Sequence, residues 1–156
     1  MPVPTRIPGV DAVRDFVGKP LGPSAWTQVT QERIDLFAQA TGDHQWIHVD
    51  PERAQRESPF GTTVAHGYLT LSLAPALLGQ ILRVEGEPTV LNTGIERMRL
   101  SAPVPAGSRV RLRAEIKRVR DLRGRGLRAT FHLVLEVEGS AKPACTADVA
   151  LVYLPS

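Results

Sequence analysis

The chain is poor in cysteine. Cys145 is the single thiol among 156 residues, which excludes an intrachain disulfide and any metal cluster built on several cysteines. It stands in an alternating apolar run, a pattern that indicates a small packed side chain. No neighbouring group in the sequence supplies the electropositive setting that a reactive thiolate needs. We therefore expect Cys145 to have a structural role.

Long hydrophobic runs are also absent. No stretch approaches the roughly 18 apolar residues of a membrane-spanning helix. Residues 1–13 lack the lysine-led apolar segment of a secretory signal. We therefore expect a cytoplasmic protein that has no membrane partner.

Aromatic residues make up only 5% of the chain, and none is interleaved with the basic residues of the segment 109–128. Because single-stranded nucleic acids are bound by aromatic stacking as well as by charge, we do not expect nucleic acid as a partner. Within 110–117, apolar residues alternate with charged ones, which predicts a half-buried strand with its arginines on the wet face. Those arginines either form a solvated surface or contact the phosphates of a coenzyme carried by the substrate.

Length and composition fit one ordinary domain. Hydrophobic residues make up 42% and charged residues 22%, which argues against a disordered or fibrous chain. Residues 1–23 hold five of the 13 prolines, so we expect an irregular N-terminal lead-in there. Residues 24–156 are then expected to form a single domain.

Two helices are expected in the first part of the chain. Thr30 can cap a helix whose apolar positions recur at helical spacing, and Gly42 can end it. Residues 43–50 are expected to form a loop. Pro51 suits the first position of a short second helix that ends near Gln55.

Residues 66–82 form the most apolar segment and contain no charged side chain. Apolar residues cover nearly every face of a helix with this sequence, and such a helix is usually buried. Pro75 removes a backbone donor in its middle, so we expect a bend there. At about 25 Å, the helix is short for a membrane span and suits the centre of a core.

Four strands are expected in the second half of the chain, where apolar and polar residues alternate between glycines and prolines. They are residues 89–100, 108–120, 127–137 and 143–154. Consecutive strands with tight turns predict an antiparallel meander. A long apolar helix followed by such strands is an α+β arrangement, in which the sheet curls around the helix. The expected architecture is therefore a single hot-dog fold, an antiparallel sheet wrapped around a long central helix.

The densest group of titratable side chains lies in residues 43–50. Asp43 and His48 could share proton transfers to and from one bound water, since a carboxylate accepts protons and an imidazole titrates near neutrality. The alternatives are a polar loop without function and a metal site. His44 and His48 stand four apart, as two helical ligands would, but no third histidine is obvious, so we expect no metal.

A second candidate element surrounds Gly67, at the N-terminal end of the apolar helix. Unpaired N–H groups there favour a developing oxyanion, and glycine allows a close approach. The alternative is that Gly67 only relieves crowding where the helix enters the sheet. For the adjoining His66, we favour a packing role, as a cap or a contact to the loop, over catalysis.

Together these two segments resemble the MaoC-like dehydratase family, which includes the (R)-specific enoyl-CoA hydratases. Those enzymes carry a motif similar to Gly-Asp-x-Asn-Pro-x-His, followed by His-Gly at the start of the hot-dog helix. The corresponding residues here are Gly42–His48 and His66–Gly67, with Gln45 and Trp46 in place of the asparagine and the proline. The segment Pro103–Gly107 also resembles the strand connection of the family.

The resemblance implies that Asp43 and His48 are the catalytic pair and that the Gly67 amide faces the thioester oxygen. The expected reaction is hydration of a 2-enoyl-CoA to an (R)-3-hydroxyacyl-CoA, or the reverse dehydration, by a hydro-lyase of fatty acid metabolism. Coenzyme A would enter as part of the substrate, without a separate cofactor. Ser72 or Thr70 could assist, or could instead bond back to the helix.

The acyl tail would lie between helix and sheet, with Trp46 and Tyr68 either as pocket walls or as ordinary packing residues. Two other functions remain open, an acyl-CoA thioesterase and a non-catalytic acyl-thioester binding module. Many thioesterases of this fold resemble one another in placing a carboxylate on or near the central helix, and residues 66–82 contain none. An unpaired edge strand would invite a second copy, so we expect a homodimer.

Overall fold

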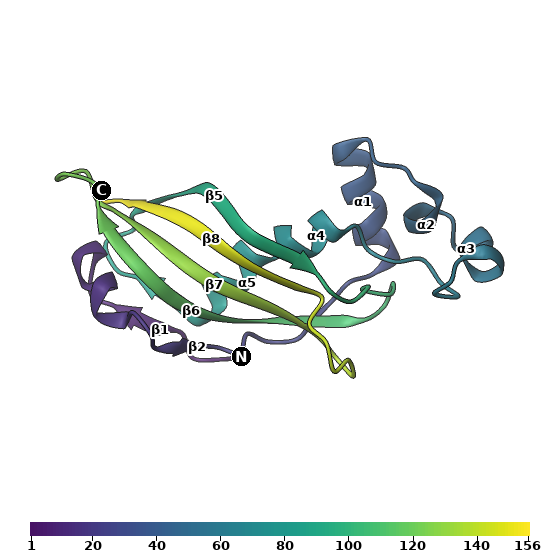
Figure 1. Cartoon of the computed structure of the whole chain (residues 1–156), viewed down its shortest axis with the longest axis horizontal. Helices are drawn as coiled ribbons and strands as arrows, with labels where there is room; N and C mark the ends of the chain where they lie inside the picture. The colour runs from purple at the N-terminus through teal and green to yellow at the C-terminus, as the bar shows by residue number, and fades with distance from the viewer.

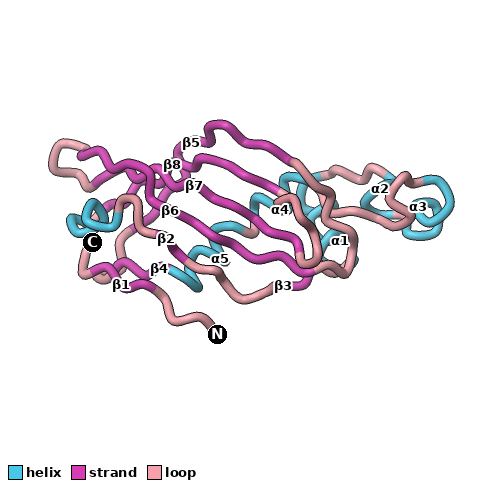
Figure 2. The backbone as a smooth tube through the Cα atoms, turned by 60° about the horizontal axis from the view of Figure 1, so that its bottom comes forward, coloured by secondary structure: helices cyan, strands magenta, loops and turns pink.

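The computed structural model describes all 156 residues. A sheet of long strands curls around α4 and α5, while α1, α2 and α3 lie beyond one end of the sheet (Figure 1 and Figure 2). The helices are α1 Gln31–Thr41, α2 Trp46–Val49, α3 Pro51–Glu57, α4 Gly67–Ser72, α5 Ala74–Ile81 and the 3-10 helix η1 Val10–Phe16. The strands are β1 Thr5–Ile7, β2 Pro20–Leu21, β3 Thr27–Gln28, β4 Leu82–Val84, β5 Thr89–Leu100, β6 Arg109–Asp121, β7 Leu127–Val137 and β8 Cys145–Leu154. This is the expected α+β hot-dog architecture, and no helix in it has the length and apolar character to cross a membrane.

The order of the strands differs from the expected meander. The sheet runs β2-β6-β7-β8-β5, so β6, β7 and β8 are consecutive antiparallel neighbours as expected. β5 instead pairs with β8, and two strands separate it from β6, so the prediction is wrong for β5. The reason lies in residues 101–108. This connection is too long for a tight hairpin, and its two prolines donate no ladder hydrogen bonds, so it carries the chain across the end of the sheet.

The central apolar segment forms two helices rather than one. α4 ends at Ser72 and α5 begins at Ala74, with Pro75 in the first turn of α5, so the helix is interrupted next to the proline. The prediction that this segment is buried on every side is wrong. Ser72, Pro75 and Gly79 are exposed and line a cavity toward β5. Because β5 is the last strand of the sheet, no further strand of this chain covers that face.

The N-terminal lead-in is ordered and joins the core. β1 pairs with β4 in parallel and β2 pairs with β6, while Ile7, Val13 and Leu21 are buried in the main hydrophobic cluster. The expectation of an irregular segment at 1–23 is therefore wrong. Its prolines are compatible with short edge strands, because an edge strand needs only part of its N–H groups for pairing.

α1 has the ends that the sequence predicts. The Thr30 hydroxyl accepts a hydrogen bond from the Arg33 amide at 3.2 Å, and Gly42 takes a left-handed conformation with φ of 79°. Ile34 and Ala38 are fully buried, and Ile34 belongs to a small second cluster, which also holds Leu69 of α4. This packing holds α1 against the start of α4. A Ser or Thr cap like Thr30 adds about 1 kcal/mol to the stability of the helix. The residues that follow Gly42 are thereby directed toward α4.

The arginines of β6 lie on the outer face of the sheet and are paired with acids. Arg109 bonds Glu138, and Arg111 and Arg113 both bond Glu136 on the neighbouring strand β7. Burial opposes ionisation of Glu136, but the two arginines outweigh it and lower the pKa of this carboxyl. These ion pairs favour the interpretation of a solvated surface over a phosphate site.

Cys145 lies at the start of β8 and is fully buried. Burial raises the pKa of its thiol, which keeps the sulfur protonated at neutral pH. The expectation of a packed structural cysteine is confirmed.

Candidate active site

The loop after α1 is shorter than expected. Asp43, His44 and Gln45 follow Gly42 without regular structure, and the chain then forms the single helical turn of α2. The Asp43 carboxylate accepts a hydrogen bond from the backbone N–H of Gln45 at 3.3 Å, which is the local bond of an Asx turn. His48 therefore projects from a helical turn rather than from the predicted loop.

His48 is buried, with 7% of its surface exposed. Its Nδ1 lies 2.6 Å from the backbone carbonyl of Val64. Because a carbonyl only accepts hydrogen bonds, Nδ1 must carry the proton, and in the neutral ring Nε2 is the nitrogen with the free lone pair. The backbone of His48 is held as well, since Gln31 donates to its carbonyl at 2.7 Å. The ring is thus presented with Nε2 available.

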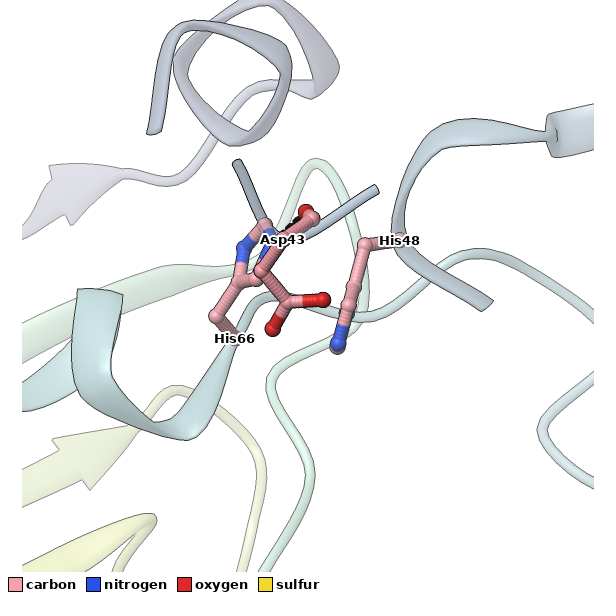
Figure 3. A group of neighbouring side chains, drawn as sticks. All are labelled: Asp43, His48 and His66. Carbon is pink, nitrogen blue, oxygen red and sulfur yellow. Dashed lines mark hydrogen bonds between the residues drawn. The ribbon is translucent and has the colours of Figure 1, made fainter. Parts of the chain in front are cut away.

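Asp43 and His48 come together as the sequence predicted, and His66 joins them. One carboxylate oxygen of Asp43 and one ring nitrogen of each histidine lie within 4.8 Å of one another, and Figure 3 shows the Asp43 carboxylate close to both histidines. A water that forms two hydrogen bonds of about 2.8 Å at a tetrahedral angle spans about 4.6 Å. This span lies within the 4.8 Å limit on the three atoms, so the cluster is compatible with a single water held between the carboxylate and an imidazole.

His66 makes the contact to the loop that the sequence offered as one alternative, and it also makes a contact to His48 that the sequence did not indicate. Its Nε2 lies 3.0 Å from the backbone carbonyl of Asp43, and its ring stacks on His48 with centroids 3.9 Å apart and planes 25° apart. Phe37 contacts the ring as well, at 4.9 Å between centroids. The side chain does not cap α4. His66 belongs to the same cluster as Asp43 and His48. Only the folded structure could show that the three side chains lie close together.

The same three residues could be considered for a metal ion. Imidazole binds a metal through a lone pair in the plane of the ring. The rings of His48 and His66 are stacked, so their in-plane lone pairs run side by side instead of converging on one point. The helical His44–His48 pair does not form either, because His44 precedes α2. The geometry favours proton chemistry over ligation.

Gly67 is the first residue of α4, and its amide donates no backbone hydrogen bond. A β-carbon at this position would meet the tip of the Leu100 side chain at the end of β5, which would have to move aside. Both interpretations from the sequence thus have a physical basis. The position is crowded, and it leaves one N–H group free.

The remaining candidates are placed less favourably. The hydroxyls of Ser72 and Thr70 donate to the backbone carbonyls one turn earlier, at 2.7 and 3.4 Å. Tyr68 is 71% exposed, and Trp46 lies against the guanidinium of Arg53 at 4.3 Å. Asp50, also in the polar cluster, caps α3 through the Arg53 amide. None of these side chains forms a hydrogen bond with the side chain of Asp43 or His48.

A cavity of about 940 Å³ lies between the exposed face of α4–α5 and the inner face of the sheet. Its walls are mostly apolar and come from both helices and from β5, β7 and β8; they include Leu71, Leu78, Ile95, Phe131 and Tyr153. Burial raises the pKa of Tyr153, so its hydroxyl stays neutral. The catalytic candidates do not line the cavity, but Leu71 brings it within about 6 Å of Gly67 along the helix axis.

Fold and site together define a known class. The family model of the MaoC like domain matches residues 13–136, and the chain therefore belongs to the MaoC-like dehydratase family. The sequence predicted a hydro-lyase, and the dehydratases of this family are hydro-lyases.

Individual relatives agree with this assignment. The chain is 51% identical over 137 residues to 3-hydroxyacyl-thioester dehydratase Z of Mycobacterium tuberculosis, covering 88% of this chain and 90% of that protein. It is 45% identical over 133 residues to nodulation protein N of Rhizobium leguminosarum bv. viciae, covering 85% and 83%. Among solved structures, an (R)-hydratase from A. caviae involved in PHA biosynthesis superposes with a TM-score of 0.71 at 25% identity, covering 89% of this chain and 96% of that one.

Proposed function

We propose that this protein adds water to a 2-enoyl thioester to form an (R)-3-hydroxyacyl thioester, or catalyses the reverse dehydration. The observation that carries the proposal is the approach of the Asp43 carboxylate and a ring nitrogen of His48 to within 4.8 Å, with Nε2 of His48 free. The relative from Mycobacterium tuberculosis, a 3-hydroxyacyl-thioester dehydratase by name, supports the same reaction.

The chemistry requires two proton transfers. As the oxygen of water bonds to C3 of the enoyl group, one proton leaves the water, and one proton is delivered to C2 on the same face. Asp43 and His48 can exchange both protons through one bound water, as acid and base. Charge that develops on the thioester oxygen is met by the free amide of Gly67.

The cavity beside α4 and α5 suits the acyl tail. Its volume of about 940 Å³ lies at the upper end of the roughly 300–1,000 Å³ typical of small-molecule sites, and most of its lining is apolar. The thioester would lie at Gly67 and the tail would run along the helix into the cavity. Coenzyme A or an acyl carrier protein would carry the acyl group, so no separate cofactor is needed.

Loss of the enoyl absorbance of crotonyl-CoA, together with thiol release, tests the proposed function. Hydration consumes the conjugated double bond without freeing thiol, and hydrolysis by a thioesterase frees thiol. A binding module does neither. We expect absorbance loss without thiol and an (R)-configured product on chiral analysis. Thiol release in place of hydration would establish the thioesterase alternative.

We also propose that the protein is a homodimer through β5. This edge strand has an unpaired side, and its apolar residues are exposed; they are Val90, Leu91, Ile95 and Leu100. Pairing of β5 with β5 of a second copy would satisfy the free backbone groups and cover the open cavity.

Size-exclusion chromatography with mass measurement tests the dimer. We expect twice the 17.0 kDa of one chain. Ile95→Lys should shift the mass to that of a monomer, because a buried charge at the interface costs several kcal/mol. Leu36→Lys on α1 is the matched control, since Leu36 is 58% exposed and Ile95 is 54% exposed. A monomeric wild-type protein would rule out the dimer.

A further inference from the structure

We propose that His66 is a positioning residue that holds both members of the Asp43–His48 pair in place. This inference rests on the proposed function. It gives a role in catalysis to a residue for which the sequence favoured packing alone. The Nε2–H group of His66 donates to the backbone carbonyl of Asp43, and the ring of His66 stacks on one face of the His48 ring.

The loop that carries Asp43 has few other restraints. Asp43 directly follows Gly42, and its side chain is exposed. Its amide reaches the Thr41 hydroxyl only at 3.4 Å, and its carboxylate bonds only within the loop. The bond from His66, 23 residues away in sequence, is the contact that ties the Asp43 backbone to the start of α4. Because Gly67 follows His66 directly, the bond from His66 also determines where the Asp43 carboxylate lies relative to the free amide of Gly67.

The ring of His48 has one hydrogen bond and one stacking contact. The bond from Nδ1 to the Val64 carbonyl lies at one edge of the ring. The stack with His66 covers one face and sets the tilt of the plane. Both restraints together fix the direction of the Nε2 lone pair.

A packing role does not explain the choice of histidine. His66 is 3% exposed, and its Nδ1 is buried without any partner. A buried polar atom without a partner destabilises the fold, so phenylalanine would fill the same volume more favourably. Histidine is the residue that offers both a donor at Nε2 and a flat ring, which indicates that both are needed.

Two substitutions separate the two contacts. His66→Gln keeps an amide donor near the position of Nε2 but loses the ring, and His66→Phe keeps the ring but loses the donor. We expect each to lower kcat for crotonyl-CoA hydration by about 10-fold, because misplacement of catalytic groups by a fraction of an ångström lowers the rate without changing substrate contacts. KM should change by less than about 3-fold. His66→Ala, which loses both contacts, should lower kcat by about 10².

A double-mutant cycle distinguishes positioning from simple stabilisation. If His66 acts through the pair, His66→Ala should lower kcat by only about 10-fold in an Asp43→Asn background, against about 10² in the wild type, because only the support of His48 is left to lose. Equal losses in both backgrounds would overturn the proposal, and so would wild-type kcat in His66→Ala. His44→Ala is the control, since His44 is exposed beside Asp43, and its kcat should match the wild type. Failure of the wild-type protein to hydrate crotonyl-CoA would instead refute the proposed function.

Discussion

Asp43→Asn is expected to lower kcat for enoyl-thioester hydration by about 10² or more, the scale of a lost acid–base group. Asparagine has almost the same shape, and its Oδ1 can still accept the hydrogen bond from the Gln45 amide that shapes the loop. It cannot exchange a proton with water. Steady-state kinetics with crotonyl-CoA measure the effect, and KM should stay close to the wild-type value because the acyl cavity is untouched.

The folded state is a simple control for this variant. Asp43 is exposed and forms no ion pair, so the melting temperature should not change measurably. An Asp43→Asn protein with wild-type kcat would remove Asp43 from the mechanism. A protein with low kcat and an unchanged fold would assign the loss to proton transfer.

The second large effect is expected at His48. His48→Gln and His48→Asn should each lower kcat by about 10² or more, because an amide does not titrate near neutral pH. The two variants differ in what they keep. Asparagine can place its amide nitrogen near Nδ1 and still donate to the Val64 carbonyl, whereas glutamine places its amide near Nε2. Equal losses in both would assign the effect to the missing imidazole.

Stability must be measured beside activity for His48, because this residue is buried and stacks on His66. Circular dichroism and the melting temperature of His48→Asn show whether the core around α2 is retained. Wild-type kcat in a folded His48→Asn protein would contradict the role of the imidazole. A drop in kcat at an unchanged melting temperature is the expected result.

Local features of this protein could be predicted from the sequence. The ends of α1 follow from Thr30 and Gly42, because a cap and a left-handed terminus involve only adjacent residues. β7 has the predicted bounds, since alternation of side chains is a property of the strand itself. Asp43 and His48 could be paired in advance because they lie only five residues apart in one short segment.

Long-range features could not be predicted in this way. β5 pairs with β8 because the chain crosses the end of the sheet, and nothing within either strand states which neighbour it takes. The order of residues 1–23 depends on β4 and β6, which come much later in the sequence. The open face of α4–α5 exists because the edge strand β5 is the last strand over it.

The sequence by itself determined the fold class and the family motif, and it predicted the candidate pair Asp43 and His48, because each of these is encoded in short segments with fixed spacing. The tertiary structure decided that His66 supports the pair, that Gly67 keeps a free amide beneath Leu100, and that a cavity opens beside the helices. The physical reason is that these contacts join residues far apart in the chain. Only the path of the folded backbone brings such residues within hydrogen-bonding or van der Waals distance.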